Sequence, residues 1–150
     1  MTRSLTLFLY RFLLAAFVCL PARAGVTEDI TIRLINSKDG HPVQGQLIVI
    51  FLGDAKLSST PRVRATTSSE GIAVVHLPEM IPKQVSLDVG NGQLKGCAWP
   101  FFSTEEVMKH GVVAENECDS REKLRKMFTA KPGEVIVFVR FLKWWEKMQT

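Results

Sequence analysis

The chain has 150 residues, of which 46% are hydrophobic and 23% charged, and its formal net charge is +4. A chain of this length has room for one domain with a substantial core, and a second domain is not expected. The sequence contains no internal repeat and no low-complexity segment.

The N-terminus has the three parts of a secretion signal. Met1-Thr2-Arg3 carries positive charge, residues 5–20 are mainly apolar, and the segment ends in Ala22-Arg23-Ala24. Small residues at these last positions suit signal peptidase, so we expect residues 1–24 to be a signal peptide that is cleaved after Ala24. The mature protein, residues 25–150, is then a single domain that is secreted or periplasmic.

Two other interpretations of this segment are possible. An uncleaved membrane anchor is disfavoured because the unbroken apolar run, residues 12–20, is too short to span a bilayer. A lipoprotein signal that uses Cys19 is disfavoured because Val18 stands where a small residue is expected. We therefore expect no membrane span in the mature protein.

Cleavage changes the charge of the protein. It removes Arg3, Arg11 and Arg23 from the 19 basic residues and leaves 16 against 15 acidic ones. A nearly neutral protein has no global electrostatic field that attracts nucleic acid, so no nucleic-acid partner is expected.

Seven short segments have the pattern of β-strands. In three of them, 29–34, 62–67 and 85–89, apolar and polar side chains alternate, as in a half-buried strand. Residues 46–52 are almost continuously aliphatic, and 134–141 has apolar residues on both faces, which predicts a buried closing strand. The Asn91-Gly92 pair favours a hairpin, with a return strand that starts near Gln93. The segments are residues 29–34, 46–52, 62–67, 72–77, 85–89, the return strand, and 134–141. They predict an all-β, antiparallel sandwich of the Ig-like or prealbumin-like kind.

The turns between the first strands have a recognisable spacing. Asp39-Gly40-His41-Pro42-Val43-Gln44-Gly45 leads into an aliphatic strand, and Thr67-Ser68-Ser69-Glu70-Gly71 leads into Val74-Val75-His76-Leu77-Pro78. This pattern resembles the carboxypeptidase regulatory-like domain, over roughly residues 30–89. The resemblance implies a prealbumin-like sandwich, related in shape to transthyretin, with a role in binding, adhesion or packing. Ser68 and Ser69 depart from the family, which often has an aspartate there, and residues from Cys97 onward have no counterpart in it.

The region after Cys97 changes character. Ser103 followed by Glu106 matches a capping box and Gly111 suits a helix end, so we expect one short helix over residues 104–110. Residues 120–128 fit either a second short helix or an edge strand.

Two cysteines remain after cleavage. In an oxidising compartment, a Cys97–Cys118 disulfide is the natural pairing; it closes a loop of about twenty residues and stabilises the fold by roughly 3 kcal/mol. The alternative is a pair of free thiols, one of them a nucleophile near His110.

Aromatic and basic residues are the candidates for binding. Trp99, Trp144 and Trp145 suit a recognition surface, because tryptophan buries a large area and keeps a hydrogen-bond donor. They equally suit the core, which is the preferred interpretation, with the C-terminal tail folded over the sandwich. Arg121 and Arg125 belong to a basic cluster that suits an acidic glycan, a phosphate or an acidic protein surface, or else lies in solvent.

Residues that would support catalysis or metal binding lack a specific spacing. His41, His76 and His110 are not spaced as zinc ligands, so no metal and no cofactor are expected. Four glutamates, Glu105, Glu106, Glu115 and Glu117, are candidates for paired catalytic carboxylates, but a solvated face is preferred.

The sequence thus favours an exported, non-enzymatic β-sandwich module that has a binding or structural role. Its partner is expected to be a protein or a glycan. The alternative is a small secreted hydrolase or thiol-dependent enzyme.

Overall fold

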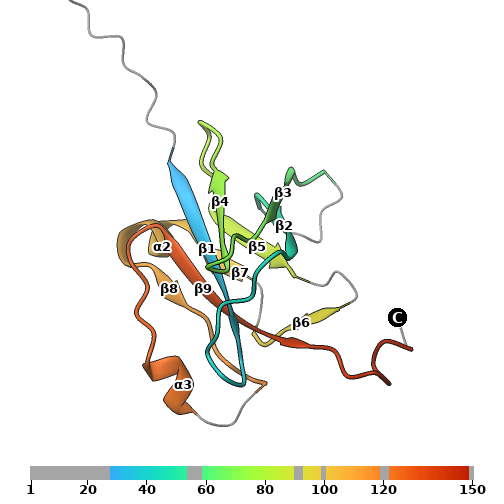
Figure 1. Cartoon of the computed structure of the whole chain (residues 1–150). Coiled ribbons are helices and arrows are strands. Elements are labelled where there is room, and N and C mark those ends of the chain that lie inside the picture. Colours follow the sequence, from blue (N-terminus) through green and yellow to red (C-terminus); the bar gives the residue numbers. More distant parts are fainter. Residues whose placement is uncertain (1–27, 54–58, 90–92, 99–100, 119–121, 149–150) are drawn as a thin grey trace, which may run out of the picture.

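The computed structural model describes residues 28–53, 59–89, 93–98, 101–118 and 122–148 (Figure 1). The expected signal peptide lies outside this part of the chain. The elements are, in order, β1 (Asp29–Asn36), β2 (Leu47–Phe51), β3 (Arg62–Thr66), β4 (Ile72–His76), β5 (Gln84–Asp88), β6 (Leu94–Gly96), β7 (Phe101–Ser103), α2 (Thr104–His110), β8 (Val112–Val113), α3 (Glu122–Lys126) and β9 (Glu134–Phe141).

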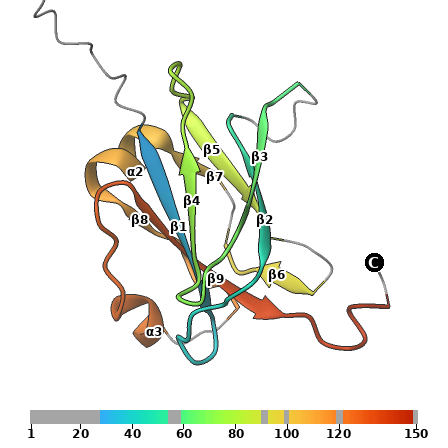
Figure 2. The ribbon, with the colours of Figure 1, turned by 45° about the horizontal axis from the view of Figure 1, so that its top comes forward.

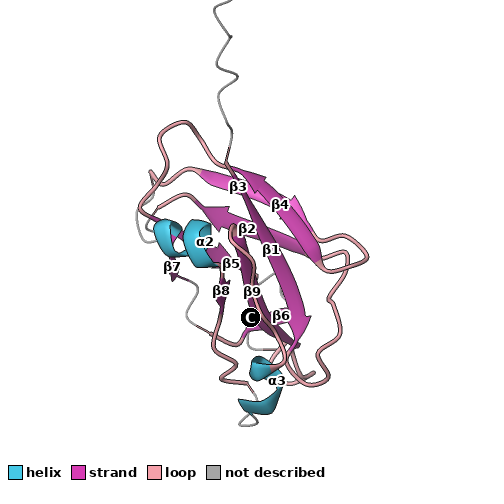
Figure 3. Cartoon of the chain, turned by 90° about the vertical axis from the view of Figure 1, so that its left-hand side faces the viewer, coloured by secondary structure: helices cyan, strands magenta, loops and turns pink. Residues whose placement is uncertain are grey.

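The strands form two sheets, which confirms a mostly β fold. One sheet has the order β4-β1-β9-β6, with β8 also paired to β9, and the other has the order β3-β2-β5-β7. In Figures 1 and 2 both helices lie on the opposite side of the molecule from β2 and β3. Figure 3 places α2 near β7 and α3 at one end of the strands.

The expectation of a purely antiparallel sandwich is wrong for the first sheet. Strands β1 and β8 both run parallel to β9, whereas the other pairs are antiparallel. Strands β1 and β9 lie at opposite ends of the described chain, so no tight turn constrains their relative direction. Alternation along each strand predicts which face is buried, but it carries no information about this direction.

The main core lies between the two sheets. Alternate residues of β1, Ile30, Ile32 and Leu34, point inward, and Ile48 and Ile50 of β2 face them from the other sheet. All five side chains are at most 2% exposed. Full burial of a side chain of this size contributes about 1.5–3 kcal/mol, so the two sheets are held together mainly by these aliphatic contacts.

Strand β9 is buried on both of its faces. Val135, Val137 and Val139 join the main core, while Ile136 and Phe138 belong to a second cluster on the outer face of the sheet. The second cluster is covered by the disulfide loop and by the segment that includes α3. The apolar residues of β9, which predicted a buried closing strand, therefore contribute side chains both to the main core and to the second cluster.

Residues 120–128, which the sequence left ambiguous, contain the helix α3. Leu124 and Phe128 are partly buried against the second cluster, and the rings of Phe128 and Phe138 meet edge to face at 5.6 Å. Leu124 lies in α3 and Phe128 lies two residues beyond its end, where the N–H of Phe128 donates to the carbonyl of Arg125. This turn brings both side chains to the second cluster.

The helix α2 is confirmed with the predicted bounds. The hydroxyl of Ser103 accepts a hydrogen bond from the backbone N–H of Glu106, and the N–H of Gly111 donates to the carbonyl of Val107. Gly111 has φ +71°, and a Cβ there would overlap the carbonyl oxygen of Lys131. Only glycine fits this position, which fixes the end of the helix.

The predicted hairpin at Asn91-Gly92 is corrected by the sheet topology. Residues 90–92 lie outside the described chain, but β5 and β6 belong to different sheets, and Leu94 of β6 pairs with Phe141 of β9. Both edges of β5 are already paired, with β2 and with β7. The return strand exists, but it cannot add to β5 and completes the other sheet instead.

The two turns with recognisable spacing pack against each other. The hydroxyl of Thr67 donates to the carbonyl of Val43 at 2.8 Å and accepts from the N–H of Gln46 at 2.9 Å. A Cβ on Gly71 would lie 2.7 Å from the carbonyl oxygen of Leu34 and 3.0 Å from the nitrogen of Val43. A buried hydroxyl side chain and a glycine therefore suit the place where the two turns meet.

Candidate functional site

The end of β9 and the segment that follows it present four large, exposed apolar side chains. Phe141, Trp144, Trp145 and Met148 are between 47% and 71% exposed, and we call these four residues the C-terminal patch. In Figures 1 and 2 this segment runs out beyond β6, away from both helices. Neighbouring exposed aromatic side chains are typical of a surface that meets another molecule.

A salt bridge holds the C-terminal patch in place. The guanidinium of Arg140 donates to both carboxylate oxygens of Glu146, at 2.7 and 2.5 Å. The N–H of Lys143 donates to the same carboxylate at 2.9 Å, and the N–H of Glu146 donates to the carbonyl of Lys143 at 3.0 Å. The chain is thereby folded into a turn that contains both tryptophans.

These contacts change the acidity of both partners. The hydrogen bonds from Arg140 and from the backbone of Lys143 lower the pKa of Glu146 from 4.5 to about 2, with a smaller electrostatic contribution from Lys95. The hydrogen bond to Glu146 raises the pKa of Arg140, although partial burial opposes this. Glu146 is therefore ionised at neutral pH, and the turn keeps its salt bridge.

The two tryptophans lie against each other at the surface. Their rings meet edge to face at 5.8 Å with an interplanar angle of 88°, and the Nζ of Lys143 lies 5.0 Å from the ring centre of Trp145. The preferred interpretation of Trp144 and Trp145 as core residues is wrong. The core is already filled by β9 and its aliphatic neighbours, so the tail is left outside it.

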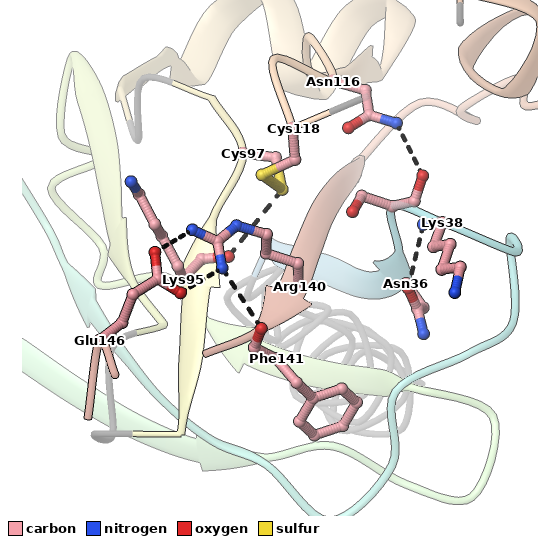
Figure 4. The surroundings of a disulfide bond; sticks show 10 residues. Asn36, Lys38, Lys95, Cys97, Asn116, Cys118, Arg140, Phe141 and Glu146 are labelled. Carbon is pink, nitrogen blue, oxygen red and sulfur yellow. Dashed lines mark hydrogen bonds and ion pairs between the residues drawn. A yellow bond between two sulfur atoms is a disulfide. The ribbon is translucent and has the colours of Figure 1, made fainter. Parts of the chain in front are cut away.

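A pocket with basic walls adjoins the patch. It has a volume of about 440 Å³ and is lined by Asn36, Ser37, Lys38, Cys118, Arg140, Phe141 and Lys143. We call it the basic pocket. Figure 4 shows Arg140 turned toward Glu146 and Lys95, with Lys38 on the other side of the view. Phe141 belongs to both the pocket and the patch.

The disulfide forms part of the wall of this pocket. Cys97 and Cys118 are bonded, as predicted, and the half-cystine of Cys97 is buried while that of Cys118 reaches the pocket (Figure 4). Neither sulfur is a thiol in this structure, so neither is available as a nucleophile.

Of the other predicted binding residues, the structure describes Arg125 alone. Trp99 and Arg121 are outside the described residues. Arg125 forms an ion pair with Glu115 at 3.0 Å and donates to the carbonyl of Val113 at 3.4 Å. Its charge is thereby partly compensated within the molecule.

Three of the four candidate glutamates lie around one hollow. Glu106, Glu115 and Glu117 line a cavity of about 430 Å³ together with Arg125, whereas Glu105 pairs with Lys109 at 2.7 Å. The three carboxylates are exposed to solvent. A general acid for glycoside cleavage needs a carboxyl group shielded from water, and these groups are not shielded.

Sequence reasoning missed the residues that frame the site. Arg140, Lys143 and Glu146 flank the tryptophans. An arginine and a glutamate on either side of two aromatic residues could have indicated this salt bridge from the sequence alone. Lys38 was not predictable, because it comes from a turn about a hundred residues earlier in the chain.

Within the described residues, no group of three histidine, cysteine or acidic side chains is placed to hold a metal ion. The same part of the chain has no helix with the length and apolar character needed to cross a membrane. No protein-family model matches the chain, and no curated protein or solved structure matches it either.

Proposed function

We propose that the chain is an exported, non-enzymatic β-sandwich module that binds a protein or a glycan through the C-terminal patch. The observation that carries this proposal is the exposed pair Trp144 and Trp145, held in a turn by the Arg140–Glu146 salt bridge. Ordering two large apolar rings at the surface is unfavourable in water unless a partner covers them.

The proposed location outside the cytoplasm has two supports. The N-terminus matches a cleavable signal, and the Cys97–Cys118 disulfide fits an oxidising compartment. The intact mass of the secreted protein tests both at once: it should begin at Gly25 and be two hydrogens lighter than the reduced form. A mass that retains the first 24 residues would contradict export by cleavage.

We also propose that the fold is of the prealbumin-like kind and related to the carboxypeptidase regulatory-like domain. The support is the contact between the two turns that carry the resemblance, through Thr67, Val43 and Gly71. In that family such domains bind or pack beside other molecules, and the same role is proposed for this chain.

The binding proposal is tested by comparing variants. The double variant with Trp144→Ala and Trp145→Ala should no longer capture a partner from an extract of the cell envelope. It should also no longer bind to the glycans of a glycan array. The matched control is Met80→Ala with Met127→Ala, which removes two other apolar side chains that are 87% and 77% exposed. The control should bind like the wild type.

Stability decides how a loss of binding is interpreted. Exposed residues contribute little to folding, so the tryptophan variant should unfold at the urea concentration of the wild type, within about 0.5 kcal/mol. Equal capture by both variants, or unfolding of the tryptophan variant, would show that the patch is not a binding surface.

A further inference from the structure

The basic pocket has an excess of positive charge. Among the described residues, its lining contains three cationic side chains, Lys38, Arg140 and Lys143, and no carboxylate. Arg140 is neutralised by Glu146, but no carboxylate of the described residues pairs with Lys38 or Lys143. Two positive charges are therefore available to an anion that enters the pocket.

The acidic residue that follows Lys38 in the chain forms no ion pair with it among the described contacts. Asp39 follows Lys38, but its carboxylate accepts hydrogen bonds from the N–H of His41 at 3.0 Å and from the amide of Asn36 at 3.3 Å. These bonds hold Asp39 within its own turn, and it does not line the pocket.

The walls of the pocket are fixed before any ligand arrives. The N–H of Ser37 donates to the carbonyl of Val139 at 2.8 Å, and the amide of Asn116 donates to the carbonyl of Ser37 at 3.2 Å. The disulfide fixes Cys118 to Cys97 beside them (Figure 4). A pocket built from three tied segments loses little conformational freedom on binding.

The size of the pocket restricts the ligand. A volume of about 440 Å³ is within the range of pockets that hold ring-sized ligands. A single aspartate or glutamate side chain of a protein partner would leave most of it empty. A flat bilayer surface would reach the protruding tryptophans, but it would not fill a recess.

From this geometry we propose that the partner is an acidic glycan, a chain of sugars that bear carboxylate or sulfate groups, with one acidic sugar in the basic pocket. Lys38 and Lys143 hold the acidic group, and the ring of Phe141 forms an apolar wall. The following sugars run over the tryptophans, because Lys143 both lines the pocket and lies against the ring of Trp145. This inference rests on the proposed function and names its ligand class.

The inference is tested by calorimetric titration of the mature, oxidised protein with two pairs of probes. A galacturonate hexamer is compared with its methyl ester, and sulfated dextran with plain dextran of equal length. At least one acidic chain should bind at least about tenfold more tightly than its neutral counterpart, because a hydrogen bond to a charged group is stronger than one to a neutral group. Its binding should weaken as salt is added.

Variants of one lysine separate the pocket from the overall charge. Lys38→Glu should weaken acidic-chain binding by about tenfold or more, whereas Lys38→Arg should retain it. The control is Lys83→Glu, which changes the net charge equally at an exposed lysine outside the basic pocket. It should bind like the wild type, and all three variants should keep the wild-type thermal midpoint.

Each contrary outcome has a distinct meaning. In one such outcome the protein binds only neutral chains, and this binding is lost in the tryptophan variant but not in Lys38→Glu. That result would overturn the proposal that the basic pocket holds an acidic sugar, but the proposed function would still stand. Equal losses of acidic-chain binding in Lys38→Glu and Lys83→Glu would overturn the proposal of an acidic glycan. Binding that depends on Lys38 but occurs only with poly-glutamate or with phosphatidylglycerol vesicles would overturn it as well. Tryptophan variants that bind every probe like the wild type would overturn the proposed function itself.

Discussion

Removal of the disulfide should destabilise the protein by about 3.3 kcal/mol. Cys97 and Cys118 are 21 residues apart, and the loop-closure relation for a cross-link of this separation gives that value at 25 °C. The effect arises mainly in the unfolded chain, which gains conformations when the cross-link is absent. We expect the thermal midpoint to fall by roughly 10 °C.

The variant for this prediction is Cys97→Ala with Cys118→Ala. The folded loop keeps other contacts, such as the hydrogen bond from the N–H of Glu117 to the carbonyl of residue 97 at 2.7 Å, so the variant should still fold. Urea unfolding followed by circular dichroism measures the loss, and the slope of the transition should rise, because the unfolded chain without the cross-link is less compact and exposes more surface.

Two comparisons decide the result. Met80→Ala, a change at an exposed side chain, should lose less than about 0.5 kcal/mol, and a reducing agent should destabilise the wild type but not the double variant. A loss below about 1 kcal/mol in the double variant would refute the reasoning, because the cross-link would then not restrict the unfolded chain.

Three further predictions concern the core, a turn and the C-terminal salt bridge. Phe138→Ala should lower the free energy of unfolding, measured by urea unfolding, by about 3–5 kcal/mol, because it leaves a cavity in place of a fully buried ring. Gly111→Ala should lower the free energy of unfolding by about 1–3 kcal/mol or more. The loss should exceed that of Gly45→Ala, because both glycines have positive φ but only the new Cβ at Gly111 overlaps the backbone at Lys131. The salt bridge of Glu146 should be intact above pH 4.5 and be lost as the pH falls toward about 2, because its pKa is lowered in the folded state. Tryptophan fluorescence should follow this loss, and Glu146→Gln should show no such transition.

Local signals predicted the individual elements well. The bounds of α2 and β9 match the expected ranges, because Ser103, Gly111 and the apolar run of residues 135–139 act within a few residues of the elements that they define. The disulfide followed from the two cysteines that remain after the expected cleavage.

Long-range pairing was not predictable from these signals. Nothing near Leu94 indicates that it pairs with Phe141 instead of extending β5, and nothing in β1 indicates that β9 runs parallel to it. Both pairings depend on which strand edges are already paired with other strands of the chain. Local alternation contains no such information.

The site was predicted only in part for the same reason. Trp144 and Trp145 were named as binding candidates, but the hydrophobicity of these residues suits core and surface alike. They lie at the surface because β9 is already covered on both faces, from Glu134 to Val139, by other parts of the chain.

The most direct test of the C-terminal patch is acrylamide quenching of tryptophan fluorescence in the Trp99→Phe protein, in which Trp144 and Trp145 are the only tryptophans. The exposed patch predicts strong quenching in the free protein and protection when the galacturonate hexamer, or another ligand that the protein binds, is added. Indoles that resist quenching in the free protein would contradict the exposed patch, and indoles that stay equally accessible when the ligand is bound would contradict its role in binding.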